Sequence, residues 1–537
     1  MSSNGSPGPK IEVFAVHGVE PEVQAYAMAK YSRSALSMKE SLKQISEQKA
    51  EQFLNTFYFQ YGHRSIADLA HIALAIERLS ILAAIAVVDE QRWDGQERST
   101  RYQDFKKSGY HVPDFGDAAA GKLYREFLDF LFAEYEAFSG EMFRYLAERT
   151  PRPEEMKQAD YDRTLRARAF DVSRYLLPLA TNTSLGQIVN ARTLETQISR
   201  LLSHTHPEVR HLGELLKQAA REPAYNVGAE AARQLVEDIR KLDPALGERA
   251  AQLLLRDVKA APTLVKYAEP DQYEIERRRE LRECAADLMN GIAPVATKVV
   301  ELCDYDPFEV EVAATLLYPH CHHSYRQLSS MVDSLPEPRR REIIDLGTRH
   351  RGQHDELPRE FAGGQRIRFD ILMDIGGFRD MHRHRRCVQI MQGFTTQHGF
   401  DIPEDIIEAG QDRRYKNAMQ RATEVCAQLA GTAASTEGVI LSGASSPAKD
   451  PAGSSDTLER EAIAQYVIPL GYRKRTLFKM DFAEAVYISE LRTGVAGHFS
   501  YRNVAWQMYE AVARRYPALA KYFRVTDVRE PVDLLKR

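Results

Sequence analysis

Apolar residues recur at three- and four-residue intervals along much of the chain, a pattern typical of amphipathic helices. The clearest example is LYREFLDFLFAEYEAFSGEMFRYLAE at residues 123–148. Two shorter runs, IEVFAV at residues 11–16 and RIRFDILMDI at residues 366–375, have the composition of β-strands. The pattern therefore predicts an α+β fold that is mainly helical and contains some sheet.

Polar and charged stretches predict where the structured regions end. Residues 1–10 and residues 442–456, which read SGASSPAKDPAGSSD, are rich in Ser, Pro and Gly. This composition favours a tail and a loop. A charged helical stretch at residues 217–257 separates the two halves of the chain.

The two halves share a layout. In the first, STRY at residues 99–102 precedes a long helix, a polar loop and RYLLPLA at residues 174–180. In the second, GFTT at residues 393–396 precedes a long helix, the Ser/Pro/Gly loop and QYVIPLG at residues 465–471. The spacing between the two motifs is nearly equal in both halves, so we infer a tandem duplication.

The length of 537 residues allows two or more domains, each with its own core. We expect a first α+β repeat at residues 11–222, a helical linker region at 223–290, and a more divergent second repeat at 291–537. Each repeat is expected to contain a small sheet.

Charge and cysteine content narrow the class of protein. The chain has 72 Lys and Arg against 76 Asp and Glu, a formal charge of −4, which is not the basic balance of a non-specific nucleic-acid binder. No run of about 18 apolar residues and no signal-peptide pattern occurs, so neither a membrane span nor secretion is expected. Five scattered cysteines suit a reducing, cytoplasmic compartment. They are Cys284, Cys303, Cys321, Cys387 and Cys426.

A cluster of basic residues follows the apolar run of the second half. The stretch FRDMHRHRRCVQIMQGFTTQHGF at residues 378–400 contains Arg383, His384 and Arg385 side by side. By itself such a cluster is an ordinary solvated surface. Planar guanidinium groups nevertheless donate paired hydrogen bonds to phosphate oxygens, so converging arginines would suit an anionic nucleotide.

Four segments of the first half carry a family resemblance. They are YGHRSIADLAH (61–71), QERSTRY (96–102), RYLLPLATNTSLGQIVNARTLE (174–195) and HPEVRHLG (206–213). Together they closely resemble the flavin-dependent (alternative) thymidylate synthases, whose signature is RHR, seven residues, Ser, and then RY two positions further on. The resemblance covers about residues 11–215 and, more weakly, 296–515. It implies two tandem repeats of that family's fold.

Each half has lost a different part of the signature. The first keeps Ser99 and Arg101 but has Asp89-Glu90-Gln91 (89–91) where RHR belongs. The second has RHR at residues 383–385, yet Gly393 and Thr395 replace the serine and the following arginine. The losses are therefore complementary.

The same complementarity continues downstream. The family arginine four positions before the Pro of the LP motif is Arg174 in the first half and Gln465 in the second. The family's Asn-Ala-Arg is present at 190–192, whereas the second half has Asp-Phe-Ala at 481–483. The last nucleotide arginine is Arg492 in the second half, while the first half has Leu at the matching position, with Arg200 one residue short.

The resemblance assigns roles to these positions. Nucleotide contacts carry over to residues of both halves, so one complete site would form between unlike halves: Glu97, Ser99, Arg101, Arg174, Arg383 and Arg492. Of these, the catalytic group would be Ser99, Arg101 and Arg174. Flavin contacts carry over to Ser32, His63, Ser65, Asp68, Asn190, Arg192, Arg383, His384 and Arg385, with Asp68 standing where the family usually has Glu.

The implied activity is reductive methylation of dUMP or a related pyrimidine nucleotide. FAD would be the cofactor, and methylenetetrahydrofolate and NADPH the co-substrates. A homodimer would imitate the family's tetramer. A second class stays open, because a fold does not fix a reaction. It is a flavin- or nucleotide-binding homologue without thymidylate synthase activity, which modifies another pyrimidine or acts as a structural pseudoenzyme.

Three other motifs have simpler interpretations. The run His-Cys-His-His at 320–323 contains good zinc ligands, but adjacent residues rarely point to one centre, so no metal is expected. A second RHR at 349–351 lies in a charged segment and is interpreted as a solvated face. Cys387, although beside the arginines, is interpreted as a packing cysteine.

Overall fold

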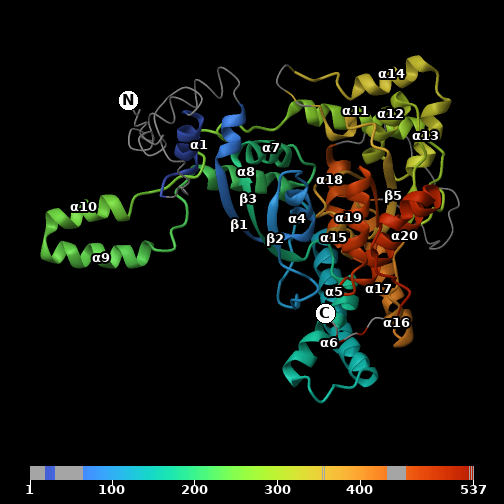
Figure 1. Ribbon diagram of the computed structural model, residues 1–537, viewed down its shortest axis with the longest axis horizontal. Coiled ribbons are helices and arrows are strands. Elements are labelled where there is room, and N and C mark those ends of the chain that lie inside the picture. Colours follow the sequence, from blue (N-terminus) through green and yellow to red (C-terminus); the bar gives the residue numbers. More distant parts are fainter. Residues whose placement is uncertain are drawn as a thin grey trace, which may run out of the picture. The chain divides into compact units, whose positions relative to one another are not determined.

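The computed structural model describes residues 18–30, 64–352, 355, 357–431, 455–530, 533 and 535 (Figure 1). The predicted strand at 11–16, the predicted tail at 1–10, Ser32 and His63 lie outside the described residues, as does most of the predicted loop at 442–456.

The described residues divide into two compact units. The first holds the described residues up to Leu74 together with Ile188–Ile198 and Glu214–Glu269. The second holds Ala75–Gln187, Ser199–Gly213 and the residues from Pro270 onward.

Helices dominate, and the strands form two small sheets, in agreement with the predicted α+β class. One sheet has the order β1-β3-β2 and the other β4-β5-β7-β6. The strands are β1 (His71–Ser80), β2 (Asp94–Glu97), β3 (Asn182–Asn190), β4 (Val300–Leu302), β5 (Ile367–Asp374), β6 (Val388–Met391) and β7 (Arg473–Met480).

The helices follow in chain order. Those before residue 260 are α1 (Pro21–Lys30), α4 (Ile81–Val88), α5 (Ala118–Arg149), α6 (Gln158–Ser173), α7 (Ala191–Leu202), α8 (Pro207–Arg221), α9 (Ala229–Leu242) and α10 (Pro244–Leu254). Those after it are α11 (Gln272–Leu288), α12 (Phe308–Leu317), α13 (Tyr325–Ser334), α14 (Glu337–Leu346), α15 (Ile375–Met381), α16 (Glu404–Glu408), α17 (Asp412–Ala430), α18 (Ser455–Ala464), α19 (Phe482–Thr493) and α20 (Phe499–Arg515). Short 3-10 turns are η2 (Arg64–Leu69), η3 (Arg174–Leu176), η4 (Tyr318–His320), η5 (Arg359–Phe361), η6 (Gln465–Val467) and η7 (Pro517–Tyr522).

The long helix predicted at 123–148 is confirmed as α5. Asp117 caps its N-terminus by accepting hydrogen bonds from the Ala119 and Ala120 amides, which otherwise lack partners. An apolar stripe at helical spacing is fully buried along it. The helix packs through this stripe against α6 and α17, with which it lies side by side (Figure 1).

The strand predicted at 366–375 is confirmed as β5, which pairs antiparallel with β7 along its whole length. It is buried on both faces and yet carries Arg368 and Asp370. Asp370 lies 2.8 Å from Arg475 of β7, and Arg368 lies 3.4 Å from Glu311. The buried charges are therefore paired, as a low-dielectric interior requires.

Helices α11 to α14 form an apolar layer on this second sheet (Figure 1). Their buried residues form one cluster with Ile390 of β6 and Leu477 of β7. Helix α11, which the sequence placed in the linker region, thus packs in the second unit. The predicted helical stretch at 217–257 is occupied by the end of α8 and by α9 and α10.

The LP segments of the two halves meet within one chain. Leu179 N donates to Ile468 O at 2.9 Å, and Leu470 N donates to Leu177 O at 2.9 Å. Pro178 stands opposite Pro469 in an antiparallel bridge. These reciprocal contacts place matching segments around a local two-fold axis inside the second unit.

Equivalent elements recur on both sides of this axis. A strand leads directly into a capped helix in each half: Ser80 caps α4 after β1, and Asp374 caps α15 after β5. The axis region is tightly packed, since a Cβ on Gly471 would lie 2.4 Å from the Tyr415 hydroxyl. In the part of the chain that the structure describes, no helix is long and apolar enough to cross a membrane.

Candidate functional site

Residues of both halves meet inside the second unit. Arg379, on α15 just before the RHR cluster, donates to a carboxylate oxygen of Glu97 and lies 3.4 Å from the Thr100 hydroxyl. The Arg379 and Glu97 side chains are each only 8% exposed. The stretch that contains Ser99 and Arg101 is therefore held against the helix that leads to the basic cluster of the second half.

Arg101 lies at the centre of this contact. Its Nε donates to Asp171 at 2.7 Å, Nη1 to the Tyr501 hydroxyl at 2.9 Å, and Nη2 to the Ala496 carbonyl at 3.1 Å. Burial alone would lower the pKa of Arg101, but the charge of Asp171 raises that pKa above its usual value. Every nitrogen of this guanidinium group therefore already has a partner in the protein.

Arg492 approaches the same aromatic ring as Arg101. The guanidinium carbons of Arg101 and Arg492 lie 5.7 and 5.4 Å from the ring centroid of Tyr501, within cation–π range. Arg492 Nε donates to His384 Nε2 at 2.8 Å. His384 Nδ1 in turn lies 3.7 Å from Glu484. Two predicted nucleotide arginines from unlike halves are thus brought together.

The neutral imidazole ring of His384 positions Arg492. Burial lowers the pKa of His384, and a hydrogen bond with Glu484 only partly opposes this. A neutral imidazole can accept at Nε2 from Arg492 while its Nδ1 hydrogen points toward Glu484. This geometry suits a positioning role for His384.

Arg174 is almost fully buried with unused donors. Its Nη1 lies 3.3 Å from the Thr100 hydroxyl and 3.9 Å from Asp380. Its Nε and Nη2 have no hydrogen-bond partner among the described residues. Buried donors without a partner are rare in proteins, so this guanidinium group is a candidate for binding an acceptor that is not part of the chain.

A pocket opens beside these residues. It is lined by Ile85, Val88, Trp93, Gly95, Glu97, Arg379, His382, Arg383 and Arg385. The Arg383 side chain is exposed and makes no hydrogen bond or ion pair with the described residues. Arg385 lies 4.9 Å from the ring centroid of Trp93, and burial lowers its pKa to about 10. The pocket thus combines an apolar wall with two arginines of the RHR cluster.

Ser99 shapes the turn that presents Arg101. Its hydroxyl accepts from the Arg101 amide at 3.2 Å, and its carbonyl accepts from the Gln103 amide at 3.1 Å. The side chain of Ser99 is half-buried. A serine in such a turn can fix the backbone and still offer its own hydroxyl to a ligand.

The remaining described flavin candidates lie in the first unit. Arg192 Nη1 is 3.4 Å from an oxygen of Asp68, so these two predicted residues form an ion pair. The Asn190 side chain accepts from the Thr193 amide at 2.8 Å and thereby caps α7. Ser65 is exposed. Their role toward a flavin stays a prediction.

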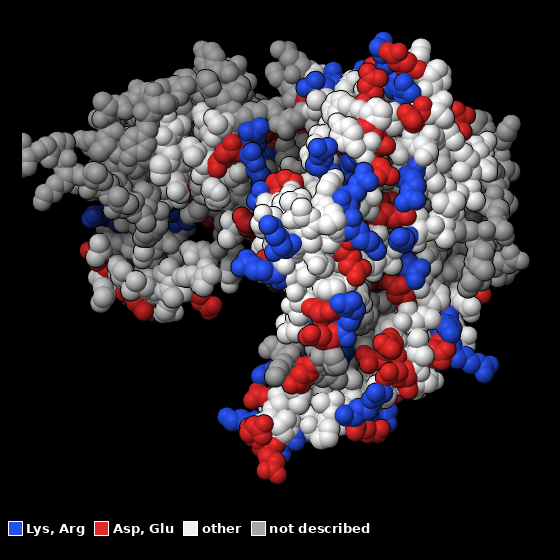
Figure 2. All heavy atoms as spheres, turned by 45° about the vertical axis from the view of Figure 1, so that its right-hand side comes forward, with Lys and Arg blue, Asp and Glu red and all other residues white. Residues whose placement is uncertain are grey.

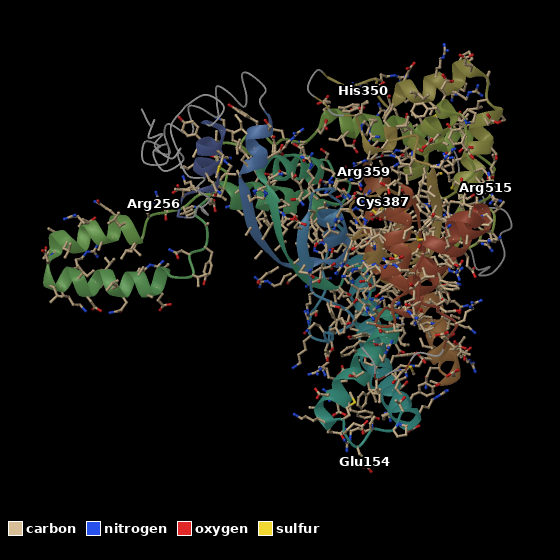
Figure 3. The ribbon with its side chains drawn as sticks, viewed as in Figure 1. Glu154, Arg256, His350, Arg359, Cys387 and Arg515 are labelled. Atoms are coloured by element: carbon tan, nitrogen blue, oxygen red, sulfur yellow. The ribbon has the colours of Figure 1, made fainter. Side chains whose placement is uncertain are left out.

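The positions that lost the signature are filled by ion pairs. Asp89, in place of the first RHR arginine, lies 2.5 Å from Arg359, which Figure 3 labels. Burial would raise the pKa of Asp89, but Arg359 lowers it below its usual range. Glu90 lies 2.8 Å from Arg200. Glu90 stands at the position that matches His384 in the second half, and Arg200 is one residue from the position that matches Arg492.

Several residues at the site were missed by sequence reasoning. Arg379 stands one helical turn before Arg383, and Asp171 stands one turn before Arg174, so helical spacing was an available signal. Tyr501 and Trp93 had none, because nothing in their local sequence marks a contact with residues hundreds of positions away.

The simpler motifs are also located. Arg349 and His350 pair with Glu280 on the surface, as expected for a solvated face. Cys387 is 3% exposed, and burial raises its pKa to about 12, as expected for a packing cysteine. Within the described ranges, no group of three or more His, Cys, Asp or Glu side chains could hold a metal ion.

The fold and the site define an α+β protein in which residues of two similar halves line one pocket. The chain belongs to the thymidylate synthase complementing protein family, whose model matches residues 16–224 and again residues 302–518. The match confirms the predicted family, and its two separate segments fit the predicted tandem arrangement.

Relatives of two kinds accompany this match. A UPF0159 protein from Chlamydia muridarum is 27% identical over 555 residues, covering 96% of this chain and 92% of the relative. A flavin-dependent thymidylate synthase from Clostridium tetani is 25% identical over 211 residues, covering 38% of this chain and 80% of the relative. A solved flavin-dependent thymidylate synthase from Helicobacter pylori, complexed with FAD and dUMP, is 16% identical with a TM-score of 0.23, covering 39% of this chain and 93% of that one.

Proposed function

We propose that the chain binds FAD and a dUMP-like pyrimidine nucleotide and catalyses the reductive methylation of that nucleotide. Methylenetetrahydrofolate would be the one-carbon donor and NADPH the reductant. The proposal is carried by contacts between the two halves inside one unit. Glu97 and Arg383 line one pocket, and Arg101 and Arg492 approach the same Tyr501 ring. Family membership supports the same conclusion.

The residues present fit anionic, ring-containing ligands. Ile85, Val88 and Trp93 offer an apolar wall for a planar ring, and Arg383 offers an unpaired guanidinium group for a phosphate. The buried, unpartnered nitrogens of Arg174 and the unpartnered Nε of Arg379 can serve further oxygens. When bound, the flavin would supply the redox chemistry and carry the one-carbon unit.

The side chains of this chain would then bind and orient. Arg383 and Arg174 would hold phosphate oxygens by charge-assisted hydrogen bonds, the geometry for which arginine is suited. Arg492, fixed through Nε by His384, would point its terminal nitrogens at the nucleotide. Ser99 and Glu97 would position the nucleotide ring, and tight positioning is the main protein contribution in a cofactor-driven reaction.

One observation favours the second candidate function, a nucleotide-binding homologue without thymidylate synthase activity. Arg101 is already saturated by Asp171, Tyr501 and the Ala496 carbonyl. A nucleotide phosphate would have to displace at least one of these partners. If it does not, the nucleotide would bind through Arg383, Arg174 and Arg492 alone, without the full constellation that the family's reaction uses.

Calorimetric titration of dUMP into three proteins tests the site. Arg383→Ala should weaken dUMP binding about ten- to a hundredfold, the value of a lost charge-assisted hydrogen bond. The matched control is Arg386→Ala, because Arg386 is three residues further on, exposed, and paired with Asp481 at 2.8 Å. Equal affinities of Arg383→Ala and the unchanged protein would refute the site.

A turnover assay separates the two functions. The purified protein is incubated with FAD, dUMP, methylenetetrahydrofolate and NADPH, and dTMP is measured by chromatography. dTMP formation that Arg383→Ala abolishes supports the synthase. Normal dUMP binding without dTMP supports the non-synthase homologue. A protein that shows no flavin absorbance after FAD addition and removal of unbound FAD excludes flavin chemistry.

A further inference from the structure

A second group of basic side chains surrounds residues 392–398 of the second half. Lys474, on β7, is 3% exposed, and its amine donates to the Gln392 carbonyl at 2.5 Å. The amine also lies 4.0 Å from the ring centroid of Phe394. A lysine buried this deeply is costly unless its charge has a partner.

Two histidines lie in the same place. The rings of His322 and His398 meet edge to face with centroids 5.7 Å apart. His322 also borders Gly393, where an added Cβ would lie 3.9 Å from the imidazole. His322 Nδ1, His398 Nε2 and the side-chain oxygen of Gln392 are buried without a hydrogen-bond partner among the described residues. Buried polar atoms without a partner are rare in proteins, so the two imidazole nitrogens are candidates for binding a ligand.

Three acids of this part of the fold are each paired with an arginine. Asp370 pairs with Arg475 at 2.8 Å and Asp401 with Arg473 at 2.6 Å. The third nearby acid, Asp89, pairs with an arginine at 2.5 Å.

Among the described residues, none of the three bases forms an ion pair with a carboxylate, although the charge of Asp89 raises the pKa of Lys474. Burial lowers the pKa of Lys474 to about 7 and, together with repulsion from nearby cations, that of His322 to about 4 and that of His398 to about 2.

The location corresponds to the degenerate half of the internal repeat. Thr395 stands where the first half has Arg101, within the GFTT segment that the bases surround. Lys474 follows Pro469 at the spacing at which Thr183 follows Pro178. The second half has thus lost a guanidinium group here and gained titratable bases.

We propose that Lys474, His322 and His398 form a second anion site that takes a tetrahedral oxyanion such as a phosphate group, with proton uptake on binding. The oxyanion would accept hydrogen bonds from the amine and from the unused ring nitrogens. It would supply the negative charge that the neighbouring carboxylates, each held by its own arginine, do not. A metal ion suits the group less well, because no free carboxylate accompanies the two imidazoles and several cations lie close by.

The GFTT segment beside the cluster lies near the surface. Gly393 is exposed, and Phe394, Thr395, Thr396 and His398 are each half-buried. An anion would enter past this segment. The proposal stands on this cluster alone and does not depend on the proposed function.

Sulfate is the probe, because its charge stays fixed between pH 5.5 and 8.5. Sulfate is titrated calorimetrically at constant ionic strength, at several pH values, and in two buffers of different ionisation heat, using the Arg383→Ala protein so that the nucleotide pocket is disabled. Affinity should fall up to about tenfold per pH unit above 7 for each proton taken up. The buffer dependence of the heat should report that proton directly.

Three variants locate the effect. Lys474→Met and His398→Gln should each abolish the proton-linked binding, and near-ultraviolet circular dichroism checks that each folds. His398 is half-buried, so its variant keeps the test valid if Lys474→Met does not fold. The control is His350→Gln, since His350 is a surface histidine bound to Glu280 (Figure 3).

Either of two results would overturn the proposal. One is sulfate binding without proton uptake, and the other is unchanged proton-linked binding in His398→Gln. Measuring dUMP affinity in His398→Gln separates the two sites, because that affinity should be normal whether or not the proposed function is correct.

Discussion

Replacing Arg101 with Ala removes the residue that joins the two halves at the site. Arg101 and Asp171 form a buried pair whose side chains are 8% and 4% exposed. Without the guanidinium group, the buried carboxylate of Asp171 would lose its ion pair with Arg101. Breaking one side of such a pair costs about 3–5 kcal/mol. The contacts of Arg101 with Tyr501 and the Ala496 carbonyl would be lost as well.

The assay is urea unfolding of four proteins: unchanged, Arg101→Ala, Asp171→Ala and the double variant. If the pair is coupled as described, the double variant should be less destabilised than the sum of the single variants, because no charge is left buried. Arg386→Ala is the control for an exposed pair, since Arg386 and Asp481 are 63% and 56% exposed, and it should change stability little.

The same pair decides whether Arg101 can bind a nucleotide. Asp171→Asn keeps the shape of the contact but removes the competing charge. If Arg101 is a phosphate ligand, dUMP should bind about tenfold more tightly to this variant, equal to about 1.4 kcal/mol. Unchanged dUMP affinity in Asp171→Asn would refute the ligand role. A loss of stability in Arg101→Ala no larger than in Arg386→Ala would refute the buried-pair argument.

Three further predictions concern the axis, the degenerate positions and acid stability. Gly471→Ala should lower the thermal midpoint, because its Cβ would lie 2.4 Å from a tyrosine hydroxyl, whereas Gly140→Ala on the surface of α5 meets nothing within 4 Å and should be neutral or slightly stabilising. Gln465→Ala should leave the calorimetric dUMP affinity unchanged, while Arg174→Ala should reduce it about ten- to a hundredfold; equal losses would contradict a single competent site. Burial lowers the pKa of His382 from 6.5 to about 4. Between pH 6.5 and pH 4 the unfolded chain therefore binds a proton at His382 that the folded protein does not bind. The free energy of unfolding measured in urea should fall as the pH drops through this range, and it should fall less steeply in His382→Gln.

The sequence predicted best what depends on local periodicity. Helix 123–148 and strand 366–375 were found because apolar spacing sets which face of an element is buried. The RHR cluster was found because its three residues are adjacent. The contact between Arg101 and Tyr501 spans 400 positions, and no pattern within either segment encodes it.

The sequence also could not distinguish a loss from a replacement. From the sequence, Asp89 shows only that the family's arginine is absent at this position. In the structure Asp89 holds Arg359 at 2.5 Å and lies 3.8 Å from His382, so it is an ionic contact in its own right. Which partner compensates a changed residue depends on tertiary packing, and a single sequence carries little information about it.

The complementary losses fit the electrostatics expected of a duplicated chain. In an assembly of identical subunits, one sequence must supply both walls of every site. Once two copies are fused, each half needs to supply only one wall. The cations of the unused site would then remain buried without a ligand, at a cost of several kcal/mol each. Replacing them with acids that pair to neighbouring arginines removes this cost, as Asp89–Arg359 and Glu90–Arg200 do. Selection for stability alone can therefore fill one site with ion pairs while the other keeps its unpaired arginine, Arg383.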